Sequence, residues 1–146
     1  MERRQDRALQ EWEALQPQSV TGDSVWRLDC YRESLFILHL ARGDVVALDC
    51  QSAPREARDQ LVTALASISA NLAEGFGRST NADRLRFLSY SIGSAREAVI
   101  WYQAVLPLGA DSRLADRLER LEHIKRMLLG LIGRLREKTR KPFEPW

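Results

Sequence analysis

Cysteine and histidine are scarce in this chain of 146 residues, which has two of each. Cys30 and Cys50 show no paired spacing, and His39 and His123 are the only histidines, so the sequence supports neither a disulfide framework nor a zinc site. We therefore expect buried free thiols, no metal and no cofactor.

Long apolar runs are also missing. No run approaches the roughly 20 apolar residues of a membrane-spanning helix, and the acidic N-terminus lacks the apolar core of a signal peptide. The sequence further lacks a glycine loop that cradles phosphates, a paired-carboxylate set and a nucleophile elbow. We expect a cytoplasmic protein without a membrane partner and without an enzymatic activity.

The composition that is present, 45% hydrophobic and 29% charged, is ordinary for a small globular domain with one core. Apolar residues recur at helical spacing in four segments separated by short polar or proline- and glycine-containing connections, which favours antiparallel neighbours. We predict an all-α protein, an up-down-up-down antiparallel four-helix bundle at residues 23–140. Residues 1–22 read as an extension with one short helix, and residues 141–146 as an irregular tail. The predicted core stripes are Leu28, Tyr31, Leu35, Leu38 and Val45, then Ala57, Leu61, Leu65, Ile68 and Leu72, then Leu85, Leu88, Ile92, Ala95, Val99, Tyr102 and Leu106, and finally Leu114, Leu118, Leu121, Leu128, Ile132 and Leu135.

Polar and glycine residues gather at the corner between the second and third predicted helices. Asn71 and Glu74 are three residues apart and so project from one helix face. Gly75 and Gly77 supply the left-handed freedom that a helix end often uses, and Thr80 or Asn81 can cap the next helix. This corner has two interpretations: a ligand site, or side chains that satisfy loop amides and pair with nearby arginines. In either case we predict one hydrogen-bonded network, made by Asn71, Glu74, Arg78 and Arg86.

The corner also carries a family resemblance. The run Ser67-Ile68-Ser69-Ala70-Asn71-Leu72-Ala73-Glu74-Gly75-Phe76-Gly77-Arg78, followed by Arg86-Phe87-Leu88 and by Gly93, Ser94 and Glu97, resembles the 23S rRNA intervening-sequence family. That family of four-helix bundles includes the accessory variability determinant protein of diversity-generating retroelements. Ser69 stands where the family pattern has proline. The resemblance is specific over residues 54–106 and implies a bundle that assembles into a ring, often a homopentamer, with nucleic acid as the suspected partner and no established catalytic activity.

The third predicted helix has a second stripe away from its core seam. On a helical wheel Phe87, Tyr90, Ser94, Trp101 and Val105 fall together. Aromatic side chains are enriched at the buried centres of interfaces, so we predict a subunit interface in a homo-oligomer. The alternative is that the N-terminal extension or the tail from Phe143 to Trp146 covers these side chains.

Charge is distributed unevenly although the net value is only +2. Residues 1–60 hold 8 basic and 11 acidic side chains, whereas residues 111–146 hold 10 basic and 6 acidic. Arginine suits phosphate because its fork binds two oxygens. We predict that RNA or DNA binds basic residues of the last helix; the alternative is a solvated face interleaved with acids. The predicted residues are Arg113, Arg117, Arg120, Arg134, Lys138 and Lys141.

These observations predict a non-enzymatic, oligomeric helical scaffold or adaptor that binds nucleic acid. One alternative is a purely structural protein-protein module with a protein partner. A distant alternative is a helical ribonuclease, in which His123 would be the general base and Arg117 would stabilise phosphate charge.

Overall fold

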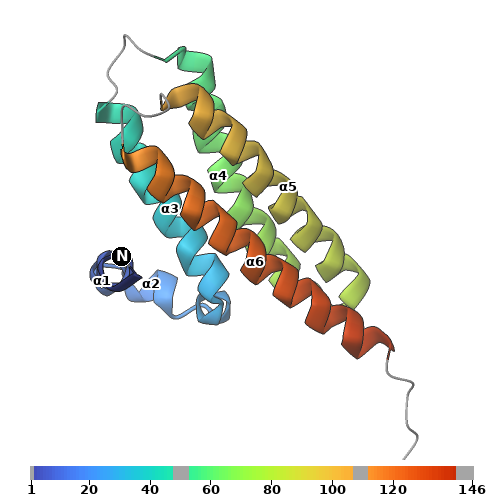
Figure 1. Cartoon of the computed structure of the whole chain (residues 1–146). Helices are drawn as coiled ribbons and strands as arrows, with labels where there is room; N and C mark the ends of the chain where they lie inside the picture. The colour runs from blue at the N-terminus through green and yellow to red at the C-terminus, as the bar shows by residue number, and fades with distance from the viewer. Residues whose placement is uncertain (1, 48–52, 107–111, 141–146) are drawn as a thin grey trace, which may run out of the picture.

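The computed structural model describes residues 2–47, 53–106 and 112–140, and within these ranges the chain is helical with no strand. Four long helices lie side by side and alternate in direction, which confirms the predicted all-α bundle (Figure 1). No helix in these ranges is long and apolar enough to cross a membrane. The elements in chain order are α1 (Glu2–Ala14), α2 (Gln18–Thr21), the 3₁₀ helix η1 (Ser24–Arg27), α3 (Asp29–Ala47), α4 (Arg55–Phe76), α5 (Asn81–Val105) and α6 (Ser112–Arg140).

The ends of α4 and α5 follow from local chemistry. Pro54 stands at the N-cap of α4, and the Thr80 hydroxyl oxygen accepts a hydrogen bond from the Asp83 backbone N–H, 3.1 Å away, at the start of α5. Gly77 caps the end of α4 with φ −75°, an ordinary right-handed value. The expectation of a left-handed glycine at this helix end is therefore wrong.

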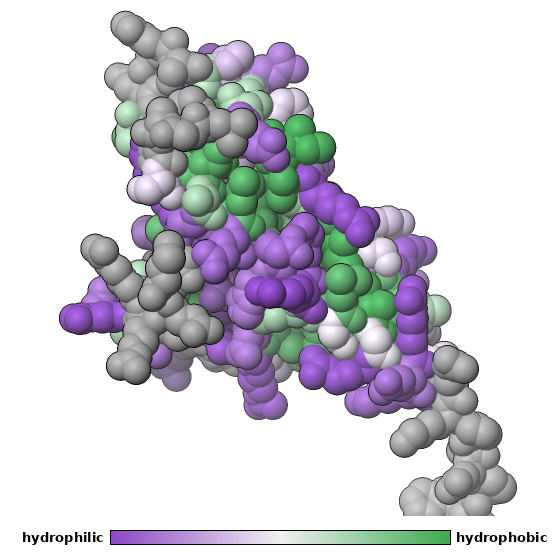
Figure 2. All heavy atoms as spheres, in the orientation of Figure 1, coloured by the Kyte–Doolittle hydropathy of each residue, from purple (hydrophilic) through white to green (hydrophobic). Residues whose placement is uncertain are grey.

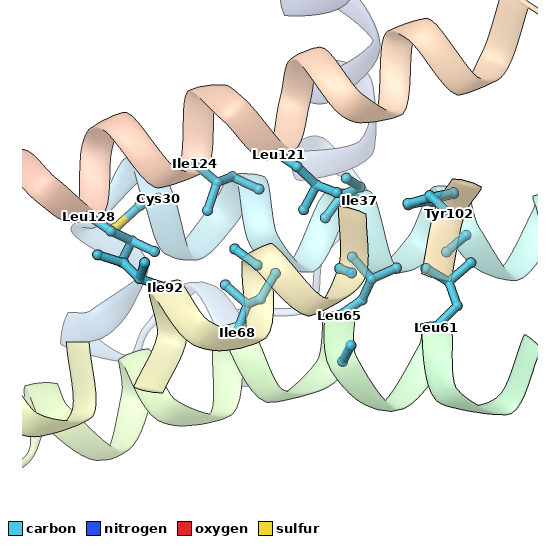
Figure 3. Packing of buried hydrophobic residues seen from close by; sticks show 14 of the residues in the cluster. Cys30, Ile37, Leu61, Leu65, Ile68, Ile92, Tyr102, Leu121, Ile124 and Leu128 are labelled. Carbon is cyan, nitrogen blue, oxygen red and sulfur yellow. The ribbon is translucent and has the colours of Figure 1, made fainter. Parts of the chain in front are cut away.

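The core runs along the centre of the bundle, between α3, α4, α5 and α6. Figure 3 shows apolar side chains from all four helices pointing toward one another. The seam predicted for α5 is confirmed, since its members are buried or pack against the core. On α6 the buried set also includes Ile124, which the predicted stripe omits.

The predicted stripe on α3 packs against the core, but the most deeply buried face of this helix lies beside it. The predicted residues Leu28, Tyr31 and Leu38 are only partly buried, whereas Cys30 and Ile37 are 3% and 0% exposed. The reason is that two polar residues on this helix are interior, namely Ser34 and Asp44. The large apolar residues of α3 therefore lie beside its most buried residues rather than among them.

The N-terminal extension packs on the outer side of α3. The Trp12 ring lies 5.4 Å from the Phe36 ring and 6.1 Å from the Trp26 ring, measured between centroids. The Arg32 guanidinium donates to the Glu13 carboxylate at 2.7 Å, which ties α1 to α3. A helix in the extension is confirmed, but the extension contains two helices, α1 and α2, where one was predicted.

Candidate functional site

The polar residues of the α4–α5 corner form separate local pairs. Glu74 and Arg78 make an ion pair with both side chains about half exposed, and Arg86 pairs with Asp83 at 3.2 Å. The Asn71 side chain donates to a backbone carbonyl one turn earlier in α4, at 2.9 Å. The prediction of one network joining Asn71, Glu74, Arg78 and Arg86 is therefore wrong, because the bonds that these groups make stay within one helix or turn. The buried Nε of Arg78 has no hydrogen-bond partner among the described residues.

Phe87 of α5 packs against the end of α4 at this corner, and the Arg84 Nε–H donates to the Arg78 backbone carbonyl at 2.7 Å. The guanidinium carbons of Arg78 and Arg86 lie 4.8 and 5.5 Å from the Phe87 ring centroid. A Cβ on Gly75 would lie 2.9 Å from the Phe87 Cβ, so glycine is needed there for close approach of α4 to α5. The corner thus reads as packing and cation–π contact rather than a polar ligand site.

The second stripe of α5 is partly open. Tyr90 is 51% exposed and meets Phe87 edge-on, with ring centroids 5.8 Å apart. Ser94 and Trp101 are half-buried, and the Trp101 indole donates to Glu97 at 3.2 Å. Val105 is only 1% exposed and belongs to the core of its own chain, so its assignment to the stripe is wrong.

The N-terminal extension packs on α3 and leaves Tyr90 open, so it is not the cover that the alternative interpretation required. The tail from Phe143 to Trp146 lies outside the described residues.

A buried ion-pair network occupies the other half of the bundle. The Asp44 carboxylate on α3 is 3% exposed and accepts two hydrogen bonds from the Arg117 guanidinium, at 2.8 and 3.0 Å. The Tyr102 hydroxyl donates to the same carboxylate at 3.3 Å, and an Arg113 nitrogen lies 3.9 Å from it. Burial lowers the pKa of Arg117, but the hydrogen bonds and charge of Asp44 outweigh burial and raise it.

The network continues along α6. Arg120 is 7% exposed, lies over the Phe36 ring at 4.9 Å and donates to Glu33 of α3 at 3.3 Å. Asp116 pairs with both Arg117 and Arg120. The predicted basic face made of Arg113, Arg117 and Arg120 is therefore wrong for the last two, because they point into the bundle and bond acids of α3.

The arrangement does not assemble the ribonuclease pair. The Arg117 guanidinium faces inward to Asp44, whereas His123 is exposed on another side of α6.

Burial raises the pKa of the Cys30 thiol to about 11, so this thiol is unreactive near neutral pH. In the described ranges no three His, Cys, Asp or Glu side chains come together as metal ligands. Cys50 lies outside those ranges.

On α6, the exposed basic residues lie instead in the C-terminal half of the helix, residues 123–140. This half has six basic residues and one acidic residue, Glu137. Arg126, Arg134, Arg136 and Lys138 are exposed. Figure 2 shows polar side chains around the lower part of this helix with apolar surface beside them. Lys141, also predicted to bind nucleic acid, lies outside the described residues.

Two cavities open beside this half of α6, and Leu28 and Leu131 line both. One, of about 400 Å³, is lined mainly by apolar residues of α4, α5 and α6, with Arg84 among them. The other, of about 410 Å³, lies between η1 with the start of α3 and α6, and its lining includes Arg27 and Arg134.

Fold and charge together define a small helical-bundle protein with an internally neutralised ion-pair network and an open basic helix end. The description of a matching family model is "23S rRNA-intervening sequence protein", and the match covers residues 47–130. Because this match spans more than half of the chain, the protein belongs to that family, as the corner motif indicated. No curated protein matches the chain.

Proposed function

We propose that this protein is a non-enzymatic helical adaptor that binds RNA or DNA phosphates through the C-terminal half of α6 and acts as a homo-oligomer. The observation that carries the proposal is the division of α6 by charge. The arginines of its first half are held by acids of the same chain, whereas Arg126, Arg134 and Lys138 are exposed with no acid bonded to them among the described residues.

Exposed cations without a bonded carboxylate favour a polyanion. Each phosphate contacted by Lys or Arg releases condensed counterions, so affinity is gained at low salt without base recognition. The helix offers no base-reading motif, so binding is expected to depend little on sequence. The family description names an rRNA, which makes RNA the first probe to use.

The open side of α5 supports assembly. Tyr90 and Ile100 are 51% and 64% exposed on this helix, and apolar surface of this kind is typically covered by another protein surface. The family resemblance suggests a pentamer. Light scattering of the parent and of Tyr90→Glu tests this: we expect a multimer that the variant dissociates, and a monomeric parent would refute oligomerisation.

Charge reversal tests nucleic-acid binding. We expect the triple variant Arg126→Glu, Arg134→Glu and Lys138→Glu to weaken binding to unrelated RNA and DNA sequences in fluorescence anisotropy, while measurable binding remains at low salt. The logarithm of the binding constant should fall with the logarithm of salt concentration, and the slope should be steeper for the parent than for this variant by about 2. This value corresponds to three phosphate contacts at ~0.7 per contact for single strands.

A matched control reverses three exposed arginines on other helices, Arg42, Arg55 and Arg96, which gives the same net charge. Equal losses in both triple variants would show a general charge effect and refute the α6 site. Absence of binding by the parent at low salt would favour the protein-protein scaffold instead.

A further inference from the structure

The cavity between η1 and α6 combines three features in one place. Its walls include the apolar side chains of Leu28, Met127 and Leu131, and its mouth carries the exposed residues Arg27 and Arg134. A volume of about 410 Å³ lies within the range of ~300–1,000 Å³ that is typical of small-molecule sites. A hollow with both apolar and polar lining, flanked by two guanidinium groups, fits a flat group that has apolar faces and polar edges and is attached to an anion.

Gly130 opens the α6 side of this cavity. A Cβ placed on Gly130 would meet no atom within 4 Å, so nothing in the chain requires glycine at this position. Glycine in a helix interior is unfavourable relative to alanine. At position 130 it leaves the cavity wall without a side chain and the helix backbone accessible. This points to an approach from outside the chain.

The same face of α6 continues the basic surface. Met127, Gly130, Leu131, Arg134 and Lys138 follow the i, i+3, i+4, i+7, i+11 spacing that keeps residues on one side of a helix. Arg134 and Lys138 are about 6 Å apart along the axis, at 1.5 Å per residue. A phosphate chain that follows this face therefore passes directly over the cavity.

We infer that this cavity takes an unpaired nucleobase of a single-stranded nucleic acid, with its phosphates on Arg27 and Arg134; the inference rests on the nucleic-acid binding proposed above. Met127 supplies a polarisable sulfur, which contacts aromatic rings favourably. Arginine both stacks on bases and binds phosphate.

One acidic residue, Asp29, also lines the cavity. Its Oδ1 accepts a hydrogen bond from Arg32 at 2.5 Å, and among the described residues Oδ2 accepts none. That second oxygen can accept a hydrogen bond from a base N–H, as carboxylates do from the cytosine amino group. A duplex keeps its bases stacked and paired, so it cannot fill the cavity, and the site must favour single strands.

The test compares a 20-nucleotide RNA without self-complementarity and the duplex it forms with its complement, by competition anisotropy at one salt concentration. Gly130→Leu places a large side chain at the cavity wall. We expect it to weaken single-strand binding about tenfold, which corresponds to about 1.4 kcal/mol and to one stacked base. Duplex binding should not change.

Gly133→Leu is the matched control. Gly133 is on the same helix, also meets no atom within 4 Å at its Cβ position, and lines neither cavity. This variant should bind both nucleic acids as the parent does. Thermal unfolding of both variants checks that leucine leaves the bundle folded.

Arg27→Ala, compared with Arg42→Ala, provides a second test that leaves α6 unaltered. We expect Arg27→Ala to weaken single-strand binding more than Arg42→Ala does. If Gly130→Leu binds single strands like Gly133→Leu, or weakens single strand and duplex equally, the base site is refuted. In that case the α6 charge-reversal variant still decides whether the helix binds nucleic acid at all, so the two failures are distinguishable.

Discussion

Removal of the Asp44 carboxylate should be among the most damaging single changes to this fold. In Asp44→Ala the Arg117 guanidinium, with its side chain 11% exposed, loses two hydrogen bonds, and the Tyr102 hydroxyl loses its acceptor. Breaking a buried ion pair from one side costs about 3–5 kcal/mol. Because Arg117 keeps its pair with Asp116, we expect the lower end, about 3 kcal/mol of unfolding free energy.

Two further variants separate the ion pair from simple loss of packing. Tyr102→Phe removes only the 3.3 Å hydrogen bond and should cost about 0.5–1.5 kcal/mol. The double variant Asp44→Leu with Arg117→Met replaces both charges with apolar groups and should be more stable than either single variant, because no charge is left buried alone.

Urea unfolding followed by circular dichroism measures these differences, at one protein concentration because assembly would add to apparent stability. An Asp44→Ala variant within 1 kcal/mol of the parent would refute the reasoning. So would a double variant whose loss equals the sum of the single losses, since additivity means that the two side chains do not interact.

Three further outcomes follow from the contacts described. Gly75→Ala should destabilise the protein by about 1–3 kcal/mol through overlap with Phe87, whereas Gly93→Ala, with open space at its Cβ, should stabilise it by about 0.5–1 kcal/mol; urea unfolding of both checks this. Glu74→Ala should cost less than about 1 kcal/mol, because its ion pair is exposed; a larger loss in the same assay would mean that the residue has an unrecognised structural role. Folding raises the pKa of the Cys30 thiol from 9.0 to about 11, which stabilises the folded state while the thiol is protonated. This stabilisation is complete below pH 9 and is lost between pH 9 and pH 11, where the thiol of the unfolded chain ionises first. The parent should thus lose about 2–3 kcal/mol more than Cys30→Ala over that interval, and parallel pH profiles would contradict this.

The helices were predictable where the apolar period was regular and the partner was near in sequence. On α5 residues spaced three and four apart formed a continuous seam, and the core confirms it. Thr80 could be named as a cap because capping depends on residues within one turn. Periodicity and capping rules succeed where the interactions that fix the structure lie within a few residues of one another.

Asp44 shows where such rules fail. The pair Gly43-Asp44 is typical of a break between segments, so the predicted core stripe of α3 leaves Asp44 out although the helix continues to Ala47. The partner of Asp44, Arg117, is 73 residues away, and Glu33 and Arg120 are separated by 87. No spacing rule along one helix indicates pairs of that separation, so the arginines of α6 resembled a basic face until the fold placed α3 opposite them.

The arginines of α6 are either buried and bonded to acids or exposed, and the difference follows from the residues opposite each half of the helix. Opposite the first half, α3 presents Glu33 and Asp44, and the arginines turn inward to them. Opposite Arg134, across the second cavity, η1 presents Arg27, another cation, and the one carboxylate in the lining already accepts a hydrogen bond from Arg32. Arg27 and Arg134 repel one another, and the single Asp29 carboxylate offsets only part of their charge. The arginines of the first half are neutralised within the chain, whereas Asp29 is the one carboxylate in the lining of the cavity beside Arg134, which is why we propose the second half as the phosphate-binding surface.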